Sequence, residues 1–384
     1  RDLVRSRGLG DVYKRQEYAT AKENLNDHLY KSDEEQQVIL TTAVDIIKLP
    51  YDSNEYTTLT GNGSMPYQIV VSQDGNVYIA LDYLAQYTAL QYSVEQEPLH
   101  IIINNQWGTK TFSDVIKEES VRLDADIKSP ILKKEATGDK VTVLEQEEEW
   151  TKVLTADGYI GYMKSKKLSD SYEEQVTSDF RAAEYTSIHK DYDMNLLWHQ
   201  VTSQDSNDAL AADIQDVKGV NVISPTWFSI SSNDGDISSL ASSDYVDTAH
   251  QNDMEVWGLM DNFSTDIDTD TVLGTTTSRE NLEGQLITEA LNYQLDGINI
   301  DIESLPEETS ESYVQFMREL SVKCRNNNLV LSVDVPSPYS FNEHYSQKEL
   351  GEVVDYVIIM GYDEHYVGSD AGSVASLPLS LIHI

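Results

Sequence analysis

From residue 190 onward, short apolar runs alternate with amphipathic stretches. Near-continuous apolar strands separated by helical patterns are typical of a parallel sheet covered by helices. The pattern predicts six strands, at residues 195–199, 220–224, 255–259, 297–303, 329–335 and 356–361. Between the fourth and fifth strands, apolar residues from Tyr313 to Cys324 recur at helical spacing, with Thr309 or Ser310 as the N-cap and Cys324 on the buried face. The most economical fold class is α/β, a (β/α)8 barrel truncated after about six strands.

Two β-rich segments precede the barrel. Residues 17–117 hold short strands at 67–71, 76–81 and 99–103 between turn signals, which predicts a small α+β module. Residues 118–169 hold strand-like runs at 140–144 and 150–154 between glycine and charged turns, which predicts a small β-barrel. An acidic linker, residues 170–189, then leads into the predicted α/β segment, residues 190–384.

The two ends of the chain differ from the rest. Residues 1–16 are net basic in a strongly acidic chain, and they resemble translated sequencing-adapter sequence, as do residues 379–384. We therefore expect a non-native leader and a fragment, the alternative being a natural basic arm. Recognisable barrel sequence stops near Pro378, so a chain lacking two strands is expected to be poorly soluble and inactive.

Composition narrows the possible partners. The chain has 66 Asp and Glu against 27 Lys and Arg, a formal charge of -39, which disfavours nucleic acid and anionic membranes. One cysteine, Cys324, cannot close an intrachain disulfide, and no apolar run approaches the roughly 20 residues of a membrane span. The acidic run at 266–270 lacks the glycine and glutamate of an EF-hand, and no His or Cys cluster has metal-ligand spacing. We expect no metal and no cofactor.

The polar residues of the fourth strand are the main candidates for chemistry. Side chains alternate along a strand, so Asn299, Asp301 and Glu303 are expected to share one face. Burying two carboxylates is costly unless they are paired, protonated or functional, and mutual repulsion raises one pKa. Glu303, nearest the strand end, is the better placed proton donor. Taken alone, an Asp-x-Glu triplet also fits exposed residues at a strand edge.

The whole stretch Asp296-Gly-Ile-Asn-Ile-Asp-Ile-Glu303 resembles the signature of glycoside hydrolase family 18, Asp-Gly-x-Asp-x-Asp-x-Glu. Asn299 stands where many chitinases carry Asp; its amide can orient Asp301 but cannot take its proton. Met360-Gly-Tyr-Asp363 resembles a second family motif, Met-x-Tyr-Asp. The Asn, and the lack of a Ser-x-Gly-Gly motif before Asn262, resemble the spore-cortex and cell-wall-lytic branch.

The upstream modules also carry resemblances. Residues 118–169 resemble a bacterial SH3 domain through Gly138-Asp-Lys140, Trp150, Asp157-Gly158 and Gly161-Tyr162. Such modules often bind cell-wall peptides, although Trp150 and Tyr162 fit a small core equally well. Residues 17–117 loosely resemble a copper-amine-oxidase N-terminal-like stalk domain, which implies no copper.

The family resemblance implies a retaining hydrolase of β-linked N-acetylglucosamine polymers, with peptidoglycan or spore cortex preferred over chitin. Family members use the substrate's own acetamido group as the nucleophile. Glu303 would be the acid and base, Asp301 would stabilise the oxazolinium ion, and Tyr362 would bind the acetamido carbonyl. Asp363 would bind sugar hydroxyls.

Further residues are weaker candidates for contact with the substrate: Asp296, Asn299, Met360, Trp227 and Asn262. For Trp227, packing at the barrel rim is an equal alternative. A non-catalytic lectin of the same fold and a wall-anchored scaffold protein are the alternative functions. The resemblance implies an extracellular or wall-associated protein, with its signal or anchor upstream.

Overall fold

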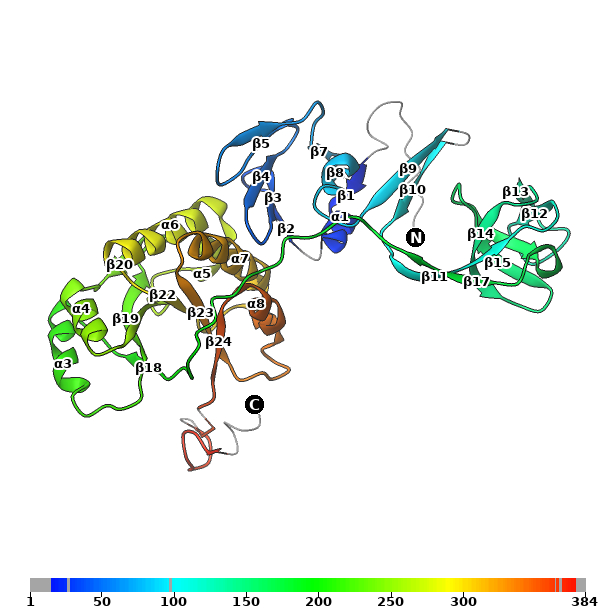
Figure 1. Ribbon diagram of the computed structural model, residues 1–384. Helices are drawn as coiled ribbons and strands as arrows, with labels where there is room; N and C mark the ends of the chain where they lie inside the picture. Colours follow the sequence, from blue (N-terminus) through cyan, green and yellow to red (C-terminus); the bar gives the residue numbers. More distant parts are fainter. Residues whose placement is uncertain (1–14, 26–27, 97–98, 363, 366–367, 378–384) are drawn as a thin grey trace. The chain divides into compact units, whose positions relative to one another are not determined.

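The computed structural model describes residues 15–25, 28–96, 99–362, 364–365 and 368–377 (Figure 1). Contacts within the chain group these residues into two compact units. The first holds the residues up to 25, 52–54 and 65–182; the second holds residues 28–51, 55–64 and those from 183 onward. None of the helices in the described part of the chain is long and apolar enough to cross a membrane.

The first unit is built mainly from antiparallel strands. A three-stranded sheet has the order β1-β8-β7, β9 pairs with β10, and a seven-stranded sheet has the order β13-β12-β16-β15-β14-β11-β17. The elements are β1 (Arg15–Glu17), α1 (Tyr18–Asn24), β7 (Val70–Gln73), β8 (Asn76–Ala80), α2 (Leu81–Leu84), β9 (Gln91–Gln96), β10 (Leu99–Asn104), β11 (Gly108–Asp114), β12 (Glu119–Arg122), β13 (Ile131–Glu135), β14 (Lys140–Gln146), β15 (Trp150–Leu154), β16 (Ile160–Lys164), η2 (Ser165–Lys167) and β17 (Tyr172–Val176).

The seven-stranded sheet encloses a small core, as predicted for the second β-rich segment. Its buried side chains are Val115, Val121, Val141, Val153, Met163 and Leu168. Trp150 and Tyr162 are only partly buried and lie outside this core. The Nζ atom of Lys164 lies 5.8 Å from the Trp150 ring centroid, so the ring contacts a cation at the surface.

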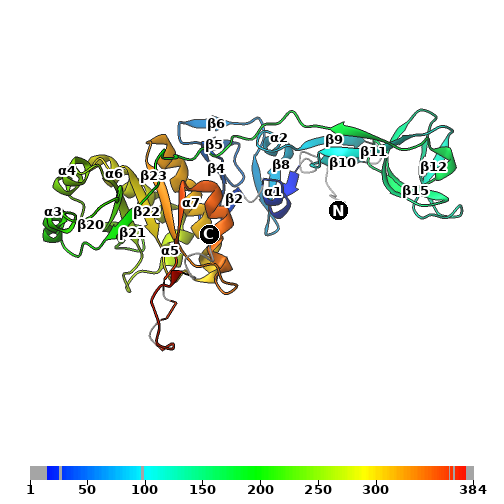
Figure 2. The same cartoon turned by 60° about the horizontal axis from the view of Figure 1, so that its bottom comes forward.

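The second unit contains the predicted parallel sheet, in the order β18-β19-β21-β22-β23-β24 (Figure 2). Its parallel strands are β18 (Leu196–His199), β19 (Val222–Ile230), β21 (Glu255–Asp261), β22 (Gly297–Asp301), β23 (Val330–Pro336) and β24 (Tyr356–Met360), and the short β20 (Ile237–Ser239) pairs antiparallel with β19. Its helices are η3 (Gln204–Ala209), α3 (Leu210–Asp213), α4 (Ser243–Gln251), α5 (Thr269–Gly274), α6 (Thr276–Asn292), η4 (Glu307–Thr309), α7 (Ser310–Asn326), η5 (Glu343–Tyr345) and α8 (Gln347–Val353). Six parallel strands in sequence order, with helices between them, confirm the predicted barrel arrangement.

The side chains on the inward face of this sheet change from mostly apolar to mostly polar along the strands. Near the amino ends it carries the apolar side chains of Val222, Trp257 and Val330, which form one buried cluster. A Cβ atom on Gly297 would lie 2.9 Å from the Trp257 ring. Only glycine at this position therefore leaves room for the indole on the inward face, near the amino ends of the strands. Two residues further along β19 and β23 the same face turns polar, with Ser224 as one example, whereas β21 carries the apolar Leu259 before it ends in Asp261.

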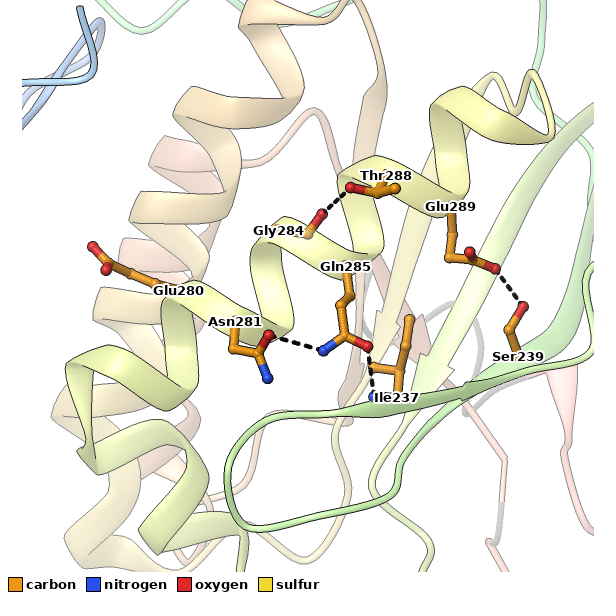
Figure 3. A pocket seen from close by; sticks show the side chains of 8 residues that line it. All are labelled: Ile237, Ser239, Glu280, Asn281, Gly284, Gln285, Thr288 and Glu289. Carbon is orange, nitrogen blue, oxygen red and sulfur yellow. Dashed lines mark hydrogen bonds between the residues drawn. The ribbon is translucent and has the colours of Figure 1, made fainter.

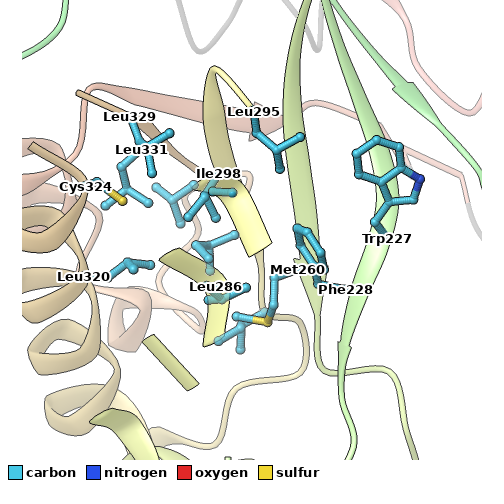
Figure 4. Close-up of a cluster of buried hydrophobic side chains, with 14 of the residues drawn as sticks. Trp227, Phe228, Met260, Leu286, Leu295, Ile298, Leu320, Cys324, Leu329 and Leu331 are labelled. Atoms are coloured by element: carbon cyan, nitrogen blue, oxygen red, sulfur yellow. The ribbon is translucent and has the colours of Figure 1, made fainter. Parts of the chain in front are cut away.

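The outward face packs against the helices and forms the main core (Figure 4). Strand residues such as Met260, Ile298 and Leu331 meet helix residues such as Leu286 and Leu320. Cys324 is 1% exposed on α7, as predicted for a structural thiol. The N-cap of this helix is Thr309, one of the two predicted positions, but its hydroxyl donates to Asp270 and makes no capping hydrogen bond.

Side-chain oxygens accept backbone hydrogen bonds at the amino ends of several strands. Asn221 accepts a hydrogen bond from the backbone N of Asn195, at 2.8 Å. Asp296 accepts one from Val256 N, and Asp355 accepts one from Leu331 N, each at 2.8 Å. Each of these residues lies just before one strand, and its side chain accepts a hydrogen bond from the backbone at the start of the parallel strand that comes before it in the sequence. These residues therefore help to set the register of the sheet.

The second unit also contains an antiparallel sheet from early in the chain, in the order β2-β3-β4-β5-β6. Its strands are β2 (Leu29–Ser32), β3 (Gln37–Thr41), β4 (Ile46–Pro50), β5 (Glu55–Thr57) and β6 (Asn62–Ser64). Val322 of α7 is buried in one cluster with Tyr30, Ile39 and Ile46 of this sheet. Residues 17–117 are thus divided between the two compact units, and their resemblance to a stalk domain stays a prediction.

We expect Ile39→Ala to destabilise the second unit by about 2–5 kcal/mol, because it leaves a cavity between this sheet and α7. Ile39 is fully buried, whereas Val44 in the same sheet region is 63% exposed. Urea unfolding monitored by circular dichroism measures the change, with Val44→Ala as the matched control. Equal, small effects of both substitutions would contradict the packing of the sheet on α7.

Candidate active site

The carboxyl ends of three neighbouring strands bring four carboxyl groups to one region of the barrel. Asp301 ends β22, Glu303 follows two residues later, Asp261 ends β21, and Asp334 lies in β23. Asp261 and Asp301 are register partners across adjacent strands. The sequence predicted Asp301 and Glu303 but not the other two. The signal that was missed is the alternation of side chains along a strand. Asp261 lies four residues after Trp257, and Asp334 lies four residues after Val330, so each carboxyl group is on the same inward face as that apolar residue.

Asp301 is a buried carboxyl group with an incomplete set of partners. It is 9% exposed, and its Oδ1 atom accepts no hydrogen bond from any described residue. Burial, followed by the negative charges of Glu303 and Asp261, raises the pKa of Asp301 to about 7. A carboxyl group with this pKa exchanges a proton near neutral pH, which an exposed aspartate does not.

Glu303 lies just beyond the strand, on a backbone segment held by Asn262. The Glu303 N atom donates to Asn262 Oδ1 at 3.0 Å, and Asn262 Nδ2 donates back to the Glu303 carbonyl oxygen at 3.0 Å. The next residue, Ser304, has a φ of 52°, and Leu305 N donates to the Tyr345 hydroxyl at 3.1 Å. The backbone around Glu303 is therefore fixed on both sides. Asn262, predicted as a substrate contact, acts here as a clamp on this backbone.

Asn299 is fully buried, and its side chain binds three neighbours. Its Oδ1 atom accepts from Trp198 Nε1 at 3.2 Å and from Ser224 Oγ at 3.1 Å, and its Nδ2 atom donates to Asp334 Oδ1 at 3.0 Å. The sequence interpretation had the amide orienting Asp301. In the structure its hydrogen bonds go to side chains of β18, β19 and β23 instead.

The second motif lies at the end of β24. Tyr362 is 41% exposed, and its hydroxyl donates to the Met360 sulfur at 2.9 Å. The Tyr362 side chain is therefore accessible from solvent at the carboxyl end of the sheet. Asp363 lies outside the described residues, so its predicted sugar contact stays a prediction.

Two residues that were predicted to contact the substrate, Trp227 and Asp296, lie away from the carboxyl groups. Trp227 is 1% exposed, its indole N–H donates to Asn207 at 2.9 Å, and its ring packs 4.9 Å from that of Tyr245, so it is a core residue. The predicted strand stops at residue 224, whereas β19 runs on to Ile230 and carries Trp227 on the same outward face as Ile223. Asp296 lies at the amino end of β22, where His250 Nε2 and the strand backbone bind it, so it is far along the strand from the carboxyl groups.

Exposed aromatic rings follow two of the strands that carry the carboxyl groups. Phe263, two residues after Asp261, is 54% exposed, and its backbone N donates to the Asp261 carboxylate. Tyr339 and Phe341, after β23, stack on each other with ring centroids 5.4 Å apart and are 48% and 76% exposed. Accessible aromatic faces suit contact with the apolar faces of sugar rings. These rings could have been found from the sequence, because aromatic residues shortly after predicted strand ends are a usable signal.

A surface groove lies away from the carboxyl groups (Figure 3). It is formed by α6 and β20, and its lining includes Asn281, Gln285 and Glu289. Several of these side chains bind one another or nearby backbone, as with Glu289 and Ser239 at 2.6 Å. The groove belongs to the outer helix layer and not to the candidate active site.

Comparisons with known proteins agree with this geometry. Residues 256–378 match the family described as glycosyl hydrolases family 18, and residues 120–169 match the bacterial SH3 domain. A Bacillus subtilis protein named "Uncharacterized glycosylase YvbX" is 28% identical over 169 residues, which cover 41% of this chain and 49% of that protein. A cortical fragment-lytic enzyme of Bacillus anthracis is 27% identical over 121 residues, covering 30% of this chain and 28% of the enzyme.

Solved structures give a weaker likeness. The spore cortex-lytic enzyme SleL of Bacillus cereus has a TM-score of 0.43 at 19% identity, covering 54% of this chain and 48% of that one. The chain spans about half the length, or less, of these curated relatives. The match to glycosyl hydrolases family 18 thus lies within the second unit, at residues 256–378, and the match to the bacterial SH3 domain lies within the first, at residues 120–169.

Proposed function

We propose that this chain is part of a glycosidase that hydrolyses β-linked N-acetylglucosamine polymers with retention of configuration. The observation that carries the proposal is the pairing of buried Asp301 with the more accessible Glu303 at the carboxyl end of β22. Active residues of (β/α)8 barrels lie at this end of the strands. The family 18 match over residues 256–378 supports the same reading.

The proposed reaction uses Glu303 twice. Its protonated carboxyl group first gives a proton to the glycosidic oxygen as the bond to the anomeric carbon breaks. The acetamido oxygen of the same sugar attacks that carbon, which forms a cyclic oxazolinium ion and frees the leaving chain. The Glu303 carboxylate then takes a proton from water, whose oxygen opens the ring and regenerates the acetamide.

Asp301 acts on the charge that develops during this sequence. As the acetamido group becomes cationic, an ionised Asp301 carboxylate beside it lowers the energy of the intermediate. A carboxyl group with a pKa near 7 can change its protonation state at the pH of the reaction. Tyr362, which is accessible at the end of β24, would bind the acetamido carbonyl.

Cell-wall glycan is the preferred substrate class. A relative is named as a cortical fragment-lytic enzyme, and the chain carries a bacterial SH3 domain upstream of the catalytic segment. Such a domain would hold the protein at peptidoglycan, which places it outside the cell or in the wall. Phe263 and the stacked Tyr339 and Phe341 would contact sugar rings beyond the cleavage site.

The test is release of reducing sugar from purified peptidoglycan, spore cortex and N-acetylglucosamine oligomers. It uses the product of the complete reading frame that encodes this chain, with the chain itself in parallel. Release from peptidoglycan or cortex supports the proposal, and faster release from the oligomers would favour chitin. Binding to these polymers without release would instead identify a lectin.

We expect Asn262→Ala to lower kcat by roughly 10-fold to 100-fold while KM changes little, because Glu303 loses the clamp on its backbone and the carboxyl group is misplaced. Asn281 on α6 is a matched control, since it is an asparagine in the outer groove. A normal kcat in Asn262→Ala would show that the clamp does not position Glu303.

A further inference from the structure

The backbone that carries Glu303 lies beyond the end of the parallel sheet. The register pairs of β22 end at Ile300 on the β23 side and at Asp301 on the β21 side. Residues 303–305 follow these last pairs, so their backbone N–H and carbonyl groups need partners other than a neighbouring strand. The side chains that supply those partners determine how firmly Glu303 is placed.

The connection between β23 and α8, residues 337–346, supplies two of them at Leu305. The Leu305 N atom donates to the hydroxyl of Tyr345, which is 6% exposed in the short helix η5, at 3.1 Å. His344 Nε2 lies 2.9 Å from the Leu305 carbonyl oxygen. A carbonyl oxygen can only accept, so Nε2 is the protonated nitrogen and donates. Two adjacent side chains thus bind both backbone polar groups of Leu305.

Ser304 lies between two residues whose backbones are held in this way. On its other side, Asn262 binds both the N atom and the carbonyl oxygen of Glu303. Ser304 has a φ of 52°, in the left-handed region, which a residue with a side chain adopts at a cost. Such a conformation persists only where the surrounding contacts enforce it. The hydrogen bonds on both sides of Ser304 do so, and they fix the direction in which the Glu303 side chain leaves the backbone.

The turn that holds Leu305 is itself anchored to α7. The Ser310 hydroxyl, at the start of that helix, donates to the His344 carbonyl oxygen. The Tyr345 ring meets the fully buried Tyr313 ring edge to face, with centroids 6.3 Å apart. Other residues of α7 pack in the main core against the sheet. The contacts on Leu305 are therefore fixed relative to the barrel.

We propose that Tyr345 and His344 are positioning residues of the active site: they hold the peptide groups of Leu305 and, with Asn262, set the direction of the Glu303 side chain. The inference rests on the proposed function, because it gives both residues a part in that reaction. They act through the Leu305 backbone and not on the reacting atoms. A carboxyl group displaced by about 1 Å transfers a proton much more slowly, so these contacts bear on kcat and not on substrate binding.

Hydrogen–deuterium exchange at the Leu305 amide tests the contact without any activity, with mass spectrometric fragmentation to resolve the residue. Tyr345→Phe keeps the ring but removes the acceptor, so exchange at Leu305 is expected to become about 10-fold faster or more. Tyr356→Phe is the matched control, because the Tyr356 hydroxyl also accepts from a backbone N atom, that of Lys190 at 3.0 Å. Equal exchange at Leu305 in both variants would overturn the proposal.

Steady-state kinetics on an N-acetylglucosamine oligomer tests the role, with the product of the complete reading frame. Tyr345→Phe is expected to lower kcat by roughly 10-fold to 100-fold with KM within a factor of about two, whereas Tyr356→Phe keeps both constants. His344→Gln retains an N–H that can reach Leu305, so it should keep most of the kcat that His344→Leu loses. If Tyr345→Phe does not fold, this pair of His344 variants decides the question.

A double variant shows whether the two sets of contacts hold the same segment. Either Asn262→Ala or Tyr345→Phe frees the backbone around Ser304, so the combined loss of kcat should be smaller than the product of the two single losses. A combined loss equal to that product would mean that Tyr345 acts apart from this segment, and would overturn the proposal. So would a normal kcat in Tyr345→Phe when the unmutated protein is active. No release by the unmutated protein would instead remove the proposed function, and this role with it.

Discussion

Glu303→Gln is expected to lower kcat on N-acetylglucosamine polymers by about 10³-fold or more, with KM within a factor of about two. The amide has the same shape as the carboxyl group but can neither give the glycosidic oxygen a proton nor take one from water. The substitution leaves the backbone bonds between residue 303 and Asn262 in place, so binding should survive. Steady-state kinetics on a soluble oligomer measures both constants.

The matched control for this prediction is Glu307→Gln. Glu307 is an exposed glutamate four residues later in the same connection, so it tests for a general effect of removing negative charge. Its kcat is expected to match that of the unmutated protein. A Glu303→Gln protein that keeps more than about a tenth of the activity would remove Glu303 from the role of acid.

Arg279→Met is expected to destabilise the second unit by about 3–5 kcal/mol, because it leaves a carboxylate buried without its cation. Arg279 is fully buried on α6, and its Nε atom donates to Glu319 of α7 at 2.8 Å. Its guanidinium carbon also lies 4.5 Å from the ring centroid of Tyr30, in the antiparallel sheet. One side chain thus links α6, α7 and that sheet. Urea unfolding monitored by circular dichroism measures the loss.

The pH dependence of this loss has a definite sign. Burial by itself raises the pKa of Glu319, but Arg279 overrides that effect and holds it below its usual value. Without Arg279, burial raises the folded-state pKa above the unfolded value, so stability falls as pH rises through the folded pKa. The cost of Arg279→Met should therefore shrink at acid pH. Adding Glu319→Gln should recover part of the stability.

The control for this pair is Lys348→Met, which removes an exposed cation from α8. It is expected to change the free energy of unfolding by less than about 0.5 kcal/mol. If Arg279→Met costs no more than Lys348→Met, the buried ion pair does not hold α6 against α7.

The parallel sheet was predictable because its strands are local patterns. Six apolar runs became β18, β19, β21, β22, β23 and β24, five of them with small shifts at their ends, while β19 extends six residues past its predicted end. The attachment of residues 28–64 to α6 and α7 was not predictable, because it depends on contacts such as Gln315 with Thr41, which are 274 residues apart in sequence. Pairings at that separation leave no local pattern in the chain.

The candidate site was predictable in part for a similar reason. Asp301 and Glu303 lie in one contiguous motif, whereas Asp334 reaches them only through strand pairing. Trp227 was misplaced because the predicted strand stops at residue 224, whereas β19 continues to Ile230 and carries Trp227 into the outer core. Asp296 belongs to the same motif, yet it lies at the far end of the strand, where it binds backbone.

Cleavage by Asp301 and Glu303 through the substrate's own acetamido group retains the configuration of the anomeric carbon. Time-resolved proton NMR of the first product from an N-acetylglucosamine oligomer, formed by the product of the complete reading frame, shows which anomer is released. We expect the β-anomer to appear first and only later to mutarotate, because two successive displacements restore the configuration. First appearance of the α-anomer would show direct attack by water and would rule out the acetamido group as the nucleophile.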